Sequence, residues 1–294
     1  MEADIYLGLS GLELNFSEME FGQGIVLRKT YACLMSPYLM AFRPVKPETH
    51  YGGPWKGAEG GKNFDVTAEL YIPATCNSRE LNTFELGKLV VALMRLWISP
   101  DITNPVISNI SFSLAASAKD NHVTLVPVET HERYIKFKTE TDGSLSEDAF
   151  LWLKEHWNNV TRLASKYNEF KLALDVLDEF HFQKSQAMNI VSLWGALEAL
   201  FLKQKYELRF RVSALIAAYL EEPGQERLDL QKKLKKLYDA RSSAAHGKPR
   251  NKTEELVKSF HVLREAVLKM IDTNRVPSQD ELEGILFGIK SSDE

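Results

Sequence analysis

The sequence predicts an α+β fold in which a β-rich first part, residues 1–145, precedes an all-helical second part, residues 146–294. Short β-prone segments separated by Gly, Pro and Ser fill most of the first part. Apolar residues at helical spacing fill most of the second. The 294 residues suffice for two domains, and 44% hydrophobic with 26% charged residues excludes a disordered, collagen-like or rod-shaped chain.

The first part is expected to contain strands around one helix. The expected strands cover residues 4–9, 12–16, 24–35, 64–73, 105–114, 123–128 and 133–138. Residues 82–97 are expected to be helical, because Leu86, Val90 and Met94 recur at helical spacing. The turn residues Asp142 and Gly143 place the expected domain boundary beside them.

A glycine-rich segment, residues 51–61, superficially suggests a phosphate-binding loop. That motif requires Gly at position 56, where the chain has Lys56, and Ser or Thr at position 63, where it has Asn63. We therefore expect residues 51–61 to form a surface loop. A nucleotidyl-transfer or nucleotide-binding function has no phosphate-cradling glycine loop to support it.

The second part is expected to be a series of helices. A first helix, capped by Ser146, is expected to present an apolar face from Phe150 to Leu163. Further helices are expected over residues 170–182, 187–202, 207–220, 225–243, 253–273 and 278–289. The segment 187–202 is apolar nearly all round, with Glu198 as its one charged residue, so we expect this helix to be central and buried.

Charge and cysteine content narrow the function classes. The net charge of −4 and a pI near 6.0 are not those of a general nucleic-acid binder. Residues 227–258 nevertheless hold ten Lys and Arg against four Asp and Glu, so positive charge is concentrated there. Cys33 and Cys76 form no zinc-binding pattern, and we expect neither a metal nor a cofactor. The absence of a signal-peptide pattern and of a long apolar run predicts a cytoplasmic protein without a membrane span.

Arg241 stands out within the basic segment. On an ideal helix it lies within about 40° of Leu230, Leu234 and Leu237, so it belongs to the apolar stripe. A guanidinium on such a stripe needs a paired carboxylate or an anionic ligand. His246 follows five residues later, about 140° around the helix. The two side chains meet only if the helix breaks between them or if two copies of the chain face each other.

The Arg–His spacing alone is a weak signal. Arg43 and His50 satisfy the same Arg-x(4–6)-His pattern in a proline-containing segment, and such a pair is more often structural. The sequence around Arg241 and His246 is a more specific signal than their spacing. Leu-Trp-Gly-Ala-Leu-Glu-Ala-Leu-Phe at 193–201, Arg-Phe-Arg-Val-Ser-Ala-Leu-Ile-Ala at 209–217 and Leu-Tyr-Asp-Ala-Arg-Ser-Ser-Ala-Ala-His-Gly at 237–247 occur in a recognisable order. In these segments the chain resembles the HEPN superfamily, most closely its Apea-like branch, over roughly residues 167–289.

The resemblance implies a bundle of four or five helices that forms a homodimer. It also implies a composite site where two Arg-x(4–6)-His motifs meet, with Arg241 and His246 at the two defining positions. Many superfamily members are metal-independent ribonucleases, often toxins or parts of antiviral defence systems. Ser242 stands where other members often have Asn, Asp or His, and it suits the Apea-like branch. Some members are non-catalytic binding or assembly modules, which is the alternative function.

The chemistry of RNA cleavage matches these two residue types. RNA carries its own nucleophile, the 2′-hydroxyl, so cleavage needs a proton carrier and a cation to stabilise the charged phosphorane. Imidazole titrates near neutral pH, as a proton carrier must. Guanidinium is permanently charged and binds phosphate oxygens in bidentate fashion. A dimer would supply two imidazoles, one as base and one as acid.

The remaining candidate residues each have a structural alternative. Glu198 is expected either to orient Arg241 or to form a buried ion pair with it, and Tyr238 either to support the site or only to pack. Arg209 and Arg211 are candidate phosphate ligands or ion-paired residues. Candidate RNA-backbone contacts, alternatively a solvated face, are Lys232, Lys233, Lys236 and Lys248. We expect the partners to be an RNA substrate, a second copy of the chain, and an unidentified trigger or partner bound by the first part.

Overall fold

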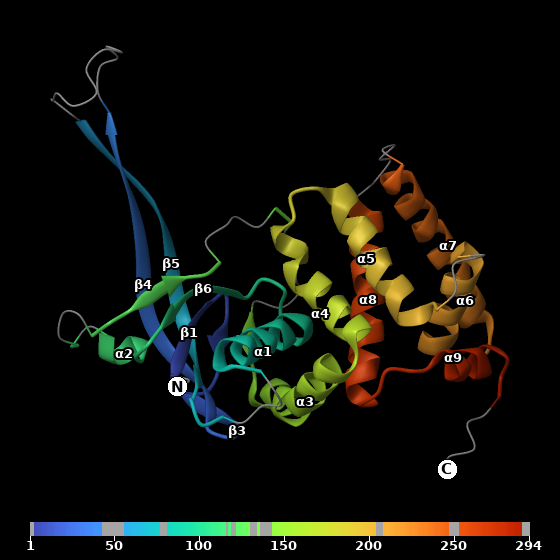
Figure 1. Ribbon diagram of the computed structural model, residues 1–294, viewed down its shortest axis with the longest axis horizontal. Coiled ribbons are helices and arrows are strands. Elements are labelled where there is room, and N and C mark those ends of the chain that lie inside the picture. The colour runs from blue at the N-terminus through green and yellow to red at the C-terminus, as the bar shows by residue number, and fades with distance from the viewer. Residues whose placement is uncertain are drawn as a thin grey trace.

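The computed structural model describes residues 3–42, 56–76, 81–115, 117–118, 122–129, 134–135, 143–203, 208–246 and 253–289. Over these residues the chain has the α+β architecture that the sequence predicts (Figure 1). An antiparallel sheet is formed by the first part, and helices make up nearly all of the second. No helix in the described part of the chain is both long and apolar enough to cross a membrane.

The main sheet has six strands in the order β3-β4-β5-β1-β6-β7, with antiparallel pairing throughout. The strands are β1 Ile5–Ser10, β3 Glu18–Gly22, β4 Ile25–Phe42, β5 Lys56–Ile72, β6 Thr103–Ser108 and β7 Leu125–Pro127. A separate parallel pair joins β2, Glu13–Leu14, to β8, Ser144–Leu145. Because side chains alternate between the two faces of a strand, Leu7 and Leu9 of β1 both enter the core.

Helix α1, Thr83–Trp97, covers the core side of the sheet. Its start is set by a capping box, in which the Asn82 side chain accepts from the Glu85 amide and Glu85 accepts from the Asn82 amide. At Gly87 the helix approaches β1 so closely that a Cβ atom would lie 2.9 Å from Leu7 Cδ1. The helix predicted over residues 82–97 is therefore confirmed, and it fixes one side of the junction with the second part.

Strands β4 and β5 continue beyond the rest of the sheet as a long two-stranded ribbon (Figure 1). Residues 56–61, expected to be loop, lie in β5, where Gly61 pairs with Pro37; that prediction was wrong there, and residues 51–55 lie outside the described part. Further down the ribbon the register shifts between Lys29 and Ala32, and Val66 pairs with Ala32. Backbone pairing then continues through the glycines because it requires no side chain.

Two other predictions for the first part need correction. The strand expected over residues 105–114 ends at Ser108, and the chain then forms the short helix α2, Phe112–Ala115. The buried Glu69 carboxylate causes this turn by accepting the Phe112 amide at 2.6 Å and the Ser111 hydroxyl at 3.0 Å. Of the strand expected over residues 133–138, only 134–135 are described, and they are not extended in a sheet. Strand β3 was not predicted.

The second part follows the predicted order of helices. They are α3 Glu147–Lys166, α4 Asn168–Glu179, the 3-10 turn η1 Phe180–Phe182, α5 Gln186–Phe201, α6 Leu208–Leu220, α7 Gln225–Ala245, α8 Thr253–Asp272 and α9 Gln279–Leu286. The Ser146 hydroxyl caps α3 by accepting the Ala149 amide, as predicted. Helix α5 packs against α4, α7 and α8, which confirms its central position.

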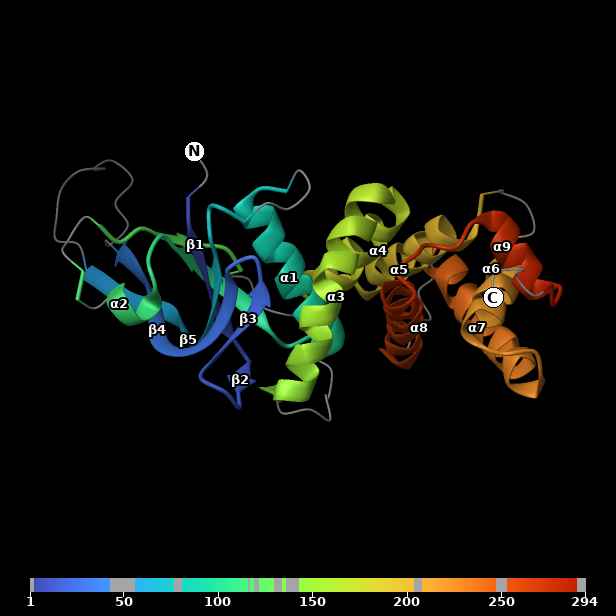
Figure 2. The same cartoon turned by 90° about the horizontal axis from the view of Figure 1, so that it is seen from below.

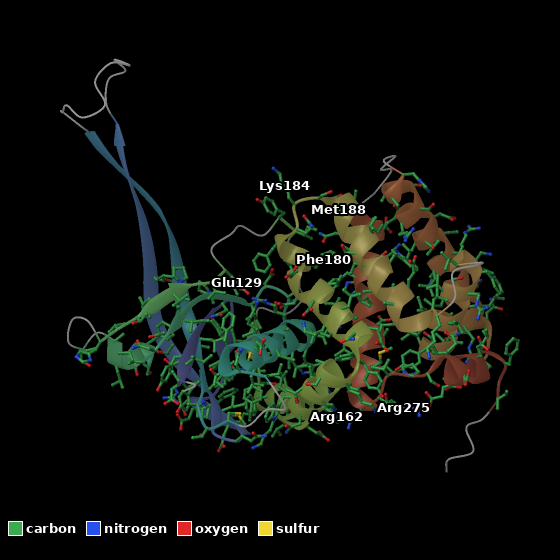
Figure 3. All side chains as sticks on the ribbon, viewed as in Figure 1. Glu129, Arg162, Phe180, Lys184, Met188 and Arg275 are labelled. Carbon is green, nitrogen blue, oxygen red and sulfur yellow. The ribbon has the colours of Figure 1, made fainter. Side chains whose placement is uncertain are left out.

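One continuous buried cluster runs through both parts of the chain. Helices α1 and α3 lie between the sheet and the remaining helices (Figure 2). At this junction Arg95 of α1 is 5% exposed and pairs with Asp178 of α4 at 2.6 Å and with Glu129 at 2.5 Å. Glu129 lies close to the Phe180 end of α4 (Figure 3). The boundary predicted at residue 145 falls between β8 and α3, and the two sides of it share a core.

Candidate functional site

Helices α5 and α7 pack side by side and bring Glu198 to Arg241. The Arg241 Nη2 atom lies 3.2 Å from Oε1 and from Oε2 of Glu198. Both side chains are about three-quarters buried, with exposed fractions of 25% for Arg241 and 21% for Glu198. Leu234 and Leu237 of α7 are buried as the apolar stripe requires. The apolar stripe of α7 therefore places Arg241 beside Glu198, the one charged residue of the central helix α5.

This pair keeps hydrogen-bonding capacity that no described residue uses. The Arg241 Nε atom is buried and has no hydrogen-bond partner among the residues that the structure describes, whereas both Glu198 carboxylate oxygens lie 3.2 Å from Arg241 Nη2. An unsatisfied buried donor or acceptor is costly, so such atoms are expected to meet a ligand, water or a second chain. Helices α5 and α7 thus position the ion pair, but they leave part of its hydrogen-bonding capacity without a partner.

Tyr238 flanks the pair, as its predicted supporting role requires. Its ring lies 5.5 Å from the Arg241 Cζ atom, within range of a cation–π contact. Burial, followed by the charge and hydrogen bond of Glu198, raises the pKa of Tyr238 to about 12. The hydroxyl is therefore protonated at neutral pH and donates to the Glu198 carboxylate.

Trp194 packs against Tyr238 and is itself held by Ser259. The Trp194 and Tyr238 rings meet edge to face, with centroids 5.2 Å apart. The Trp194 Nε1 atom donates to the Ser259 hydroxyl of α8 at 3.1 Å. Sequence reasoning quoted Trp194 within the motif but did not predict this contact, because nothing local indicates which helix faces the indole.

His246 lies away from the pair in the same chain. Helix α7 continues through Ala245, and the His246 amide still donates to the Ser242 carbonyl at 3.2 Å. The helix break that was one route to convergence is absent between Arg241 and His246. The Ser243 hydroxyl explains this, because it donates to the Asp239 carbonyl within the helix and opens no turn.

The two motif residues consequently face different directions. With the helix intact, His246 lies about 140° around α7 from Arg241, and its side chain is exposed. Of the two routes to convergence, only the meeting of two copies is compatible with this geometry. Ser242 is partly buried in the last turn, where its carbonyl accepts the His246 amide.

Both candidate arginines of α6 are ion-paired, in line with the structural alternative. Arg209 Nη2 lies 2.5 Å from Asp239 Oδ2, and each of these side chains is about half exposed. Arg211 Nη2 lies 2.8 Å from Glu283 Oε1 of α9. The Arg209–Asp239 pair is exposed, and exposed ion pairs contribute little to stability.

The three candidate lysines of α7 that the structure describes lie within about 100° of one another around the helix. Relative to His246, Lys232 lies about 40° around the helix, Lys236 about 80° and Lys233 about 140°. Lys232 also lies 3.2 Å from the Asp229 carboxylate. Lys248 lies outside the described residues. Of these three, Lys232 thus lies nearest to the side of α7 that carries His246, and Lys233 lies farthest from it.

Phe210, between Arg209 and Arg211, is a surface residue that sequence reasoning missed. Its side chain is 57% exposed at the start of α6. The available signal was an aromatic residue between two cations at a helix start. Sequence reasoning considered the arginines and left the ring unassigned.

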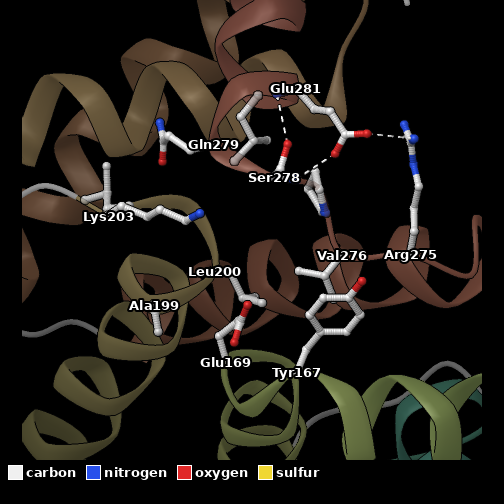
Figure 4. Close-up of a pocket in the computed structure, with 13 residues that line it drawn as sticks. Tyr167, Glu169, Ala199, Leu200, Lys203, Arg275, Val276, Ser278, Gln279 and Glu281 are labelled. Atoms are coloured by element: carbon white, nitrogen blue, oxygen red, sulfur yellow. Dashed lines mark hydrogen bonds and ion pairs between the residues drawn. The ribbon is translucent and has the colours of Figure 1, made fainter.

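A cavity lies at the C-terminal end of α5, where Ala199 and Leu200 line it. It has a volume of about 480 Å³ and is lined by Tyr167, Lys203 and the segment joining α8 to α9 (Figure 4). Its Arg275 is paired with Glu281 at 2.9 Å, and Ser278 caps α9. Neither Glu198 nor Arg241 lines this cavity, although Ala199, the residue after Glu198, does.

Comparison of the chain with protein-family models, with curated proteins and with solved structures found no match. Membership of the HEPN superfamily thus stays a prediction that rests on the residues quoted above.

Proposed function

We propose that this protein is a metal-independent endoribonuclease of the HEPN type, acting in antiviral defence or a toxin-like system. Its composite Arg-x4-His site would lie at a homodimer interface. The supporting observation is the Glu198–Arg241 pair: a cation on the apolar stripe of α7, held by the central helix and left with unused hydrogen-bonding capacity. An anionic group such as a phosphate is the ligand that this arrangement suits.

Cleavage proceeds by transfer within the RNA. One His246 imidazole removes the proton of the 2′-hydroxyl, and the 2′-oxygen forms a bond to phosphorus. Arg241 stabilises the negative charge that develops on the phosphorane oxygens. The bond from phosphorus to the 5′-oxygen then breaks, and the second imidazole, in its protonated form, gives its proton to that oxygen. The products are a 2′,3′-cyclic phosphate and a free 5′-hydroxyl.

Two copies of the chain are required because the Arg241 and His246 side chains lie apart within one chain. Arg241 and His246 lie about 140° apart on an intact helix, so a single scissile phosphate does not contact both from one chain. A two-fold axis beside the end of α7 brings the His246 of one protomer to the Arg241 of its partner. Glu198 and Tyr238 orient the guanidinium in this scheme.

The second candidate function is a non-catalytic HEPN-like module for RNA or nucleotide binding or for assembly. One observation favours it: within a single chain the charge of Arg241 is already balanced by Glu198, and His246 does not contact either. A module of this kind needs the bundle and the basic surface but no convergence of the motif.

Incubating the purified protein with defined single-stranded RNA in excess EDTA tests the proposal. We expect discrete cleavage, with 2′,3′-cyclic phosphate or 3′-phosphate ends on the upstream products. RNA that stays intact at micromolar protein, with or without added divalent metal, would contradict the nuclease and leave the binding module.

A further inference from the structure

An open depression lined in part by an aromatic ring lies between α6 and α7. It is lined by Leu208, Arg209 and Phe210 of α6 and by Lys235 of α7, with a volume of about 520 Å³. Phe210 is more than half exposed, which is unusual for a phenylalanine in an otherwise well-buried helix. The depression therefore combines one accessible ring with two cations.

The depression is on the side of α7 that carries His246. Lys235 lies about 20° around the helix from His246 and, eleven residues earlier, about 16 Å along its axis. Asp239 is between them on the same side and holds Arg209 at 2.5 Å. A continuous face thus leads from the exposed ring to the imidazole over the length of a few extended nucleotides.

We propose that this depression is a base-stacking subsite for single-stranded RNA. A base stacks on the Phe210 ring, while Lys235 and Arg209 contact the phosphates on either side of it. This inference rests on the proposed function and deepens it, because it states where the strand lies relative to the cleaved phosphate.

The chemistry favours RNA over a protein partner. Sequence-tolerant single-strand binding combines aromatic platforms with cations that follow the backbone, and stacking on one ring is a substantial share of the affinity. A stable protein interface needs a far larger and better-packed apolar area than one ring and one leucine supply. Asp239 is a carboxylate on the strand's path, and its pairing with Arg209 limits its repulsion of phosphate.

RNA binding by the full-length His246→Ala protein tests the subsite without cleavage of the probe. The probe is a short single-stranded RNA that carries 2-aminopurine at successive positions, because its fluorescence reports stacking. In this background, Phe210→Ala should weaken binding by roughly 5- to 150-fold and abolish the fluorescence change at one position. Phe210→Trp should retain both.

The chain supplies a matched control pair in the first part. Phe84 is 40% exposed, and the Lys88 ammonium lies 5.5 Å from its ring centroid, so it offers the same groups far from α7. Phe84→Ala should leave RNA binding unchanged. Lys235→Gln should reduce the slope of log affinity against log salt by about one, whereas Lys88→Gln should not.

Any one of three results would overturn the subsite. The first is equal RNA affinity of the Phe210→Ala and parent proteins, and the second is an equal loss of RNA affinity in Phe84→Ala and Phe210→Ala. The third is a Phe210→Ala protein that changes only its oligomeric state in light scattering. The nuclease and the subsite fail separately. Phe210-dependent binding by a wild-type protein that never cleaves RNA supports the subsite and refutes the nuclease. Cleavage unaffected by Phe210→Ala refutes the subsite alone.

Discussion

Neutralising Glu198 isolates the contribution of the Glu198–Arg241 pair. The change Glu198→Gln keeps the size and one oxygen acceptor of the side chain but leaves the guanidinium without its counter-charge. Exposed ion pairs contribute about 0.2–1 kcal/mol, and removing one partner of a fully buried pair costs about 3–5 kcal/mol. Because both side chains are about three-quarters buried, we expect a loss of about 2 kcal/mol in the free energy of unfolding.

Urea unfolding at neutral pH, followed by far-UV circular dichroism, measures this loss. The matched control is Asp175→Asn in the exposed Lys171–Asp175 pair, whose nitrogen-to-oxygen distance of 2.8 Å is shorter than that of the site pair. If the burial of an ion pair, rather than its nitrogen-to-oxygen distance, determines its contribution to stability, the free energy of unfolding of the control should fall by no more than about 0.5 kcal/mol. The reasoning is refuted if the two substitutions cost the same.

A double-mutant cycle completes this prediction. Arg241→Met alone leaves the Glu198 carboxylate, about three-quarters buried, without its counter-charge, and it should also cost about 2 kcal/mol. The double variant should lose less than the two single variants together, with a coupling energy of about 1–2 kcal/mol. Strict additivity would mean that the two side chains do not interact in solution.

Three further predictions concern other parts of the molecule. In urea titrations, Arg95→Met should lower the free energy of unfolding by about 3–5 kcal/mol, because it leaves two carboxylates at the junction without their counter-charge. A loss below about 1 kcal/mol would contradict the shared core. Burial raises the pKa of Tyr219 to about 12, and burial with Glu198 does the same for Tyr238. The pKa of each tyrosine is higher in the folded state than the unfolded value near 10. Their contribution to the free energy of unfolding is therefore complete below about pH 10 and is lost as the pH rises toward 12. The loss with pH should be less steep in Tyr238→Phe. Light scattering at micromolar concentration should give a dimer, and a monomer that still cleaves RNA would exclude the composite site.

The helical part was predictable because its signals are local. The Ser146 cap, the break at Pro223 and Gly224, and the nearly uncharged central helix each depend on residues close in sequence. The pairing of Arg241 with Glu198 was also predictable, because the helical period puts the cation on the apolar stripe and the central helix offers only one carboxylate.

The rest depends on contacts between distant residues. The turn into α2 is set by Glu69, more than forty positions earlier, and strand β5 begins at Lys56 because it pairs with β4 along its whole length. Whether α7 would break before His246 was undecidable from the serines, since a hydroxyl can either cap a turn or bond back to its own helix. The exposure of Phe210 follows from which side of α6 its neighbours cover, and that is likewise a tertiary property.

Cleavage by the His246→Ala protein, assayed beside wild type after both are shown to be folded and dimeric, tests the central claim most directly. His246 is exposed at the end of α7, so its loss should leave stability nearly unchanged. The account predicts that His246→Ala and Arg241→Ala each abolish most cleavage and that the double variant is little worse, since residues that act as a unit are not additive. Equal cleavage by wild type and His246→Ala would contradict the ribonuclease assignment for this motif.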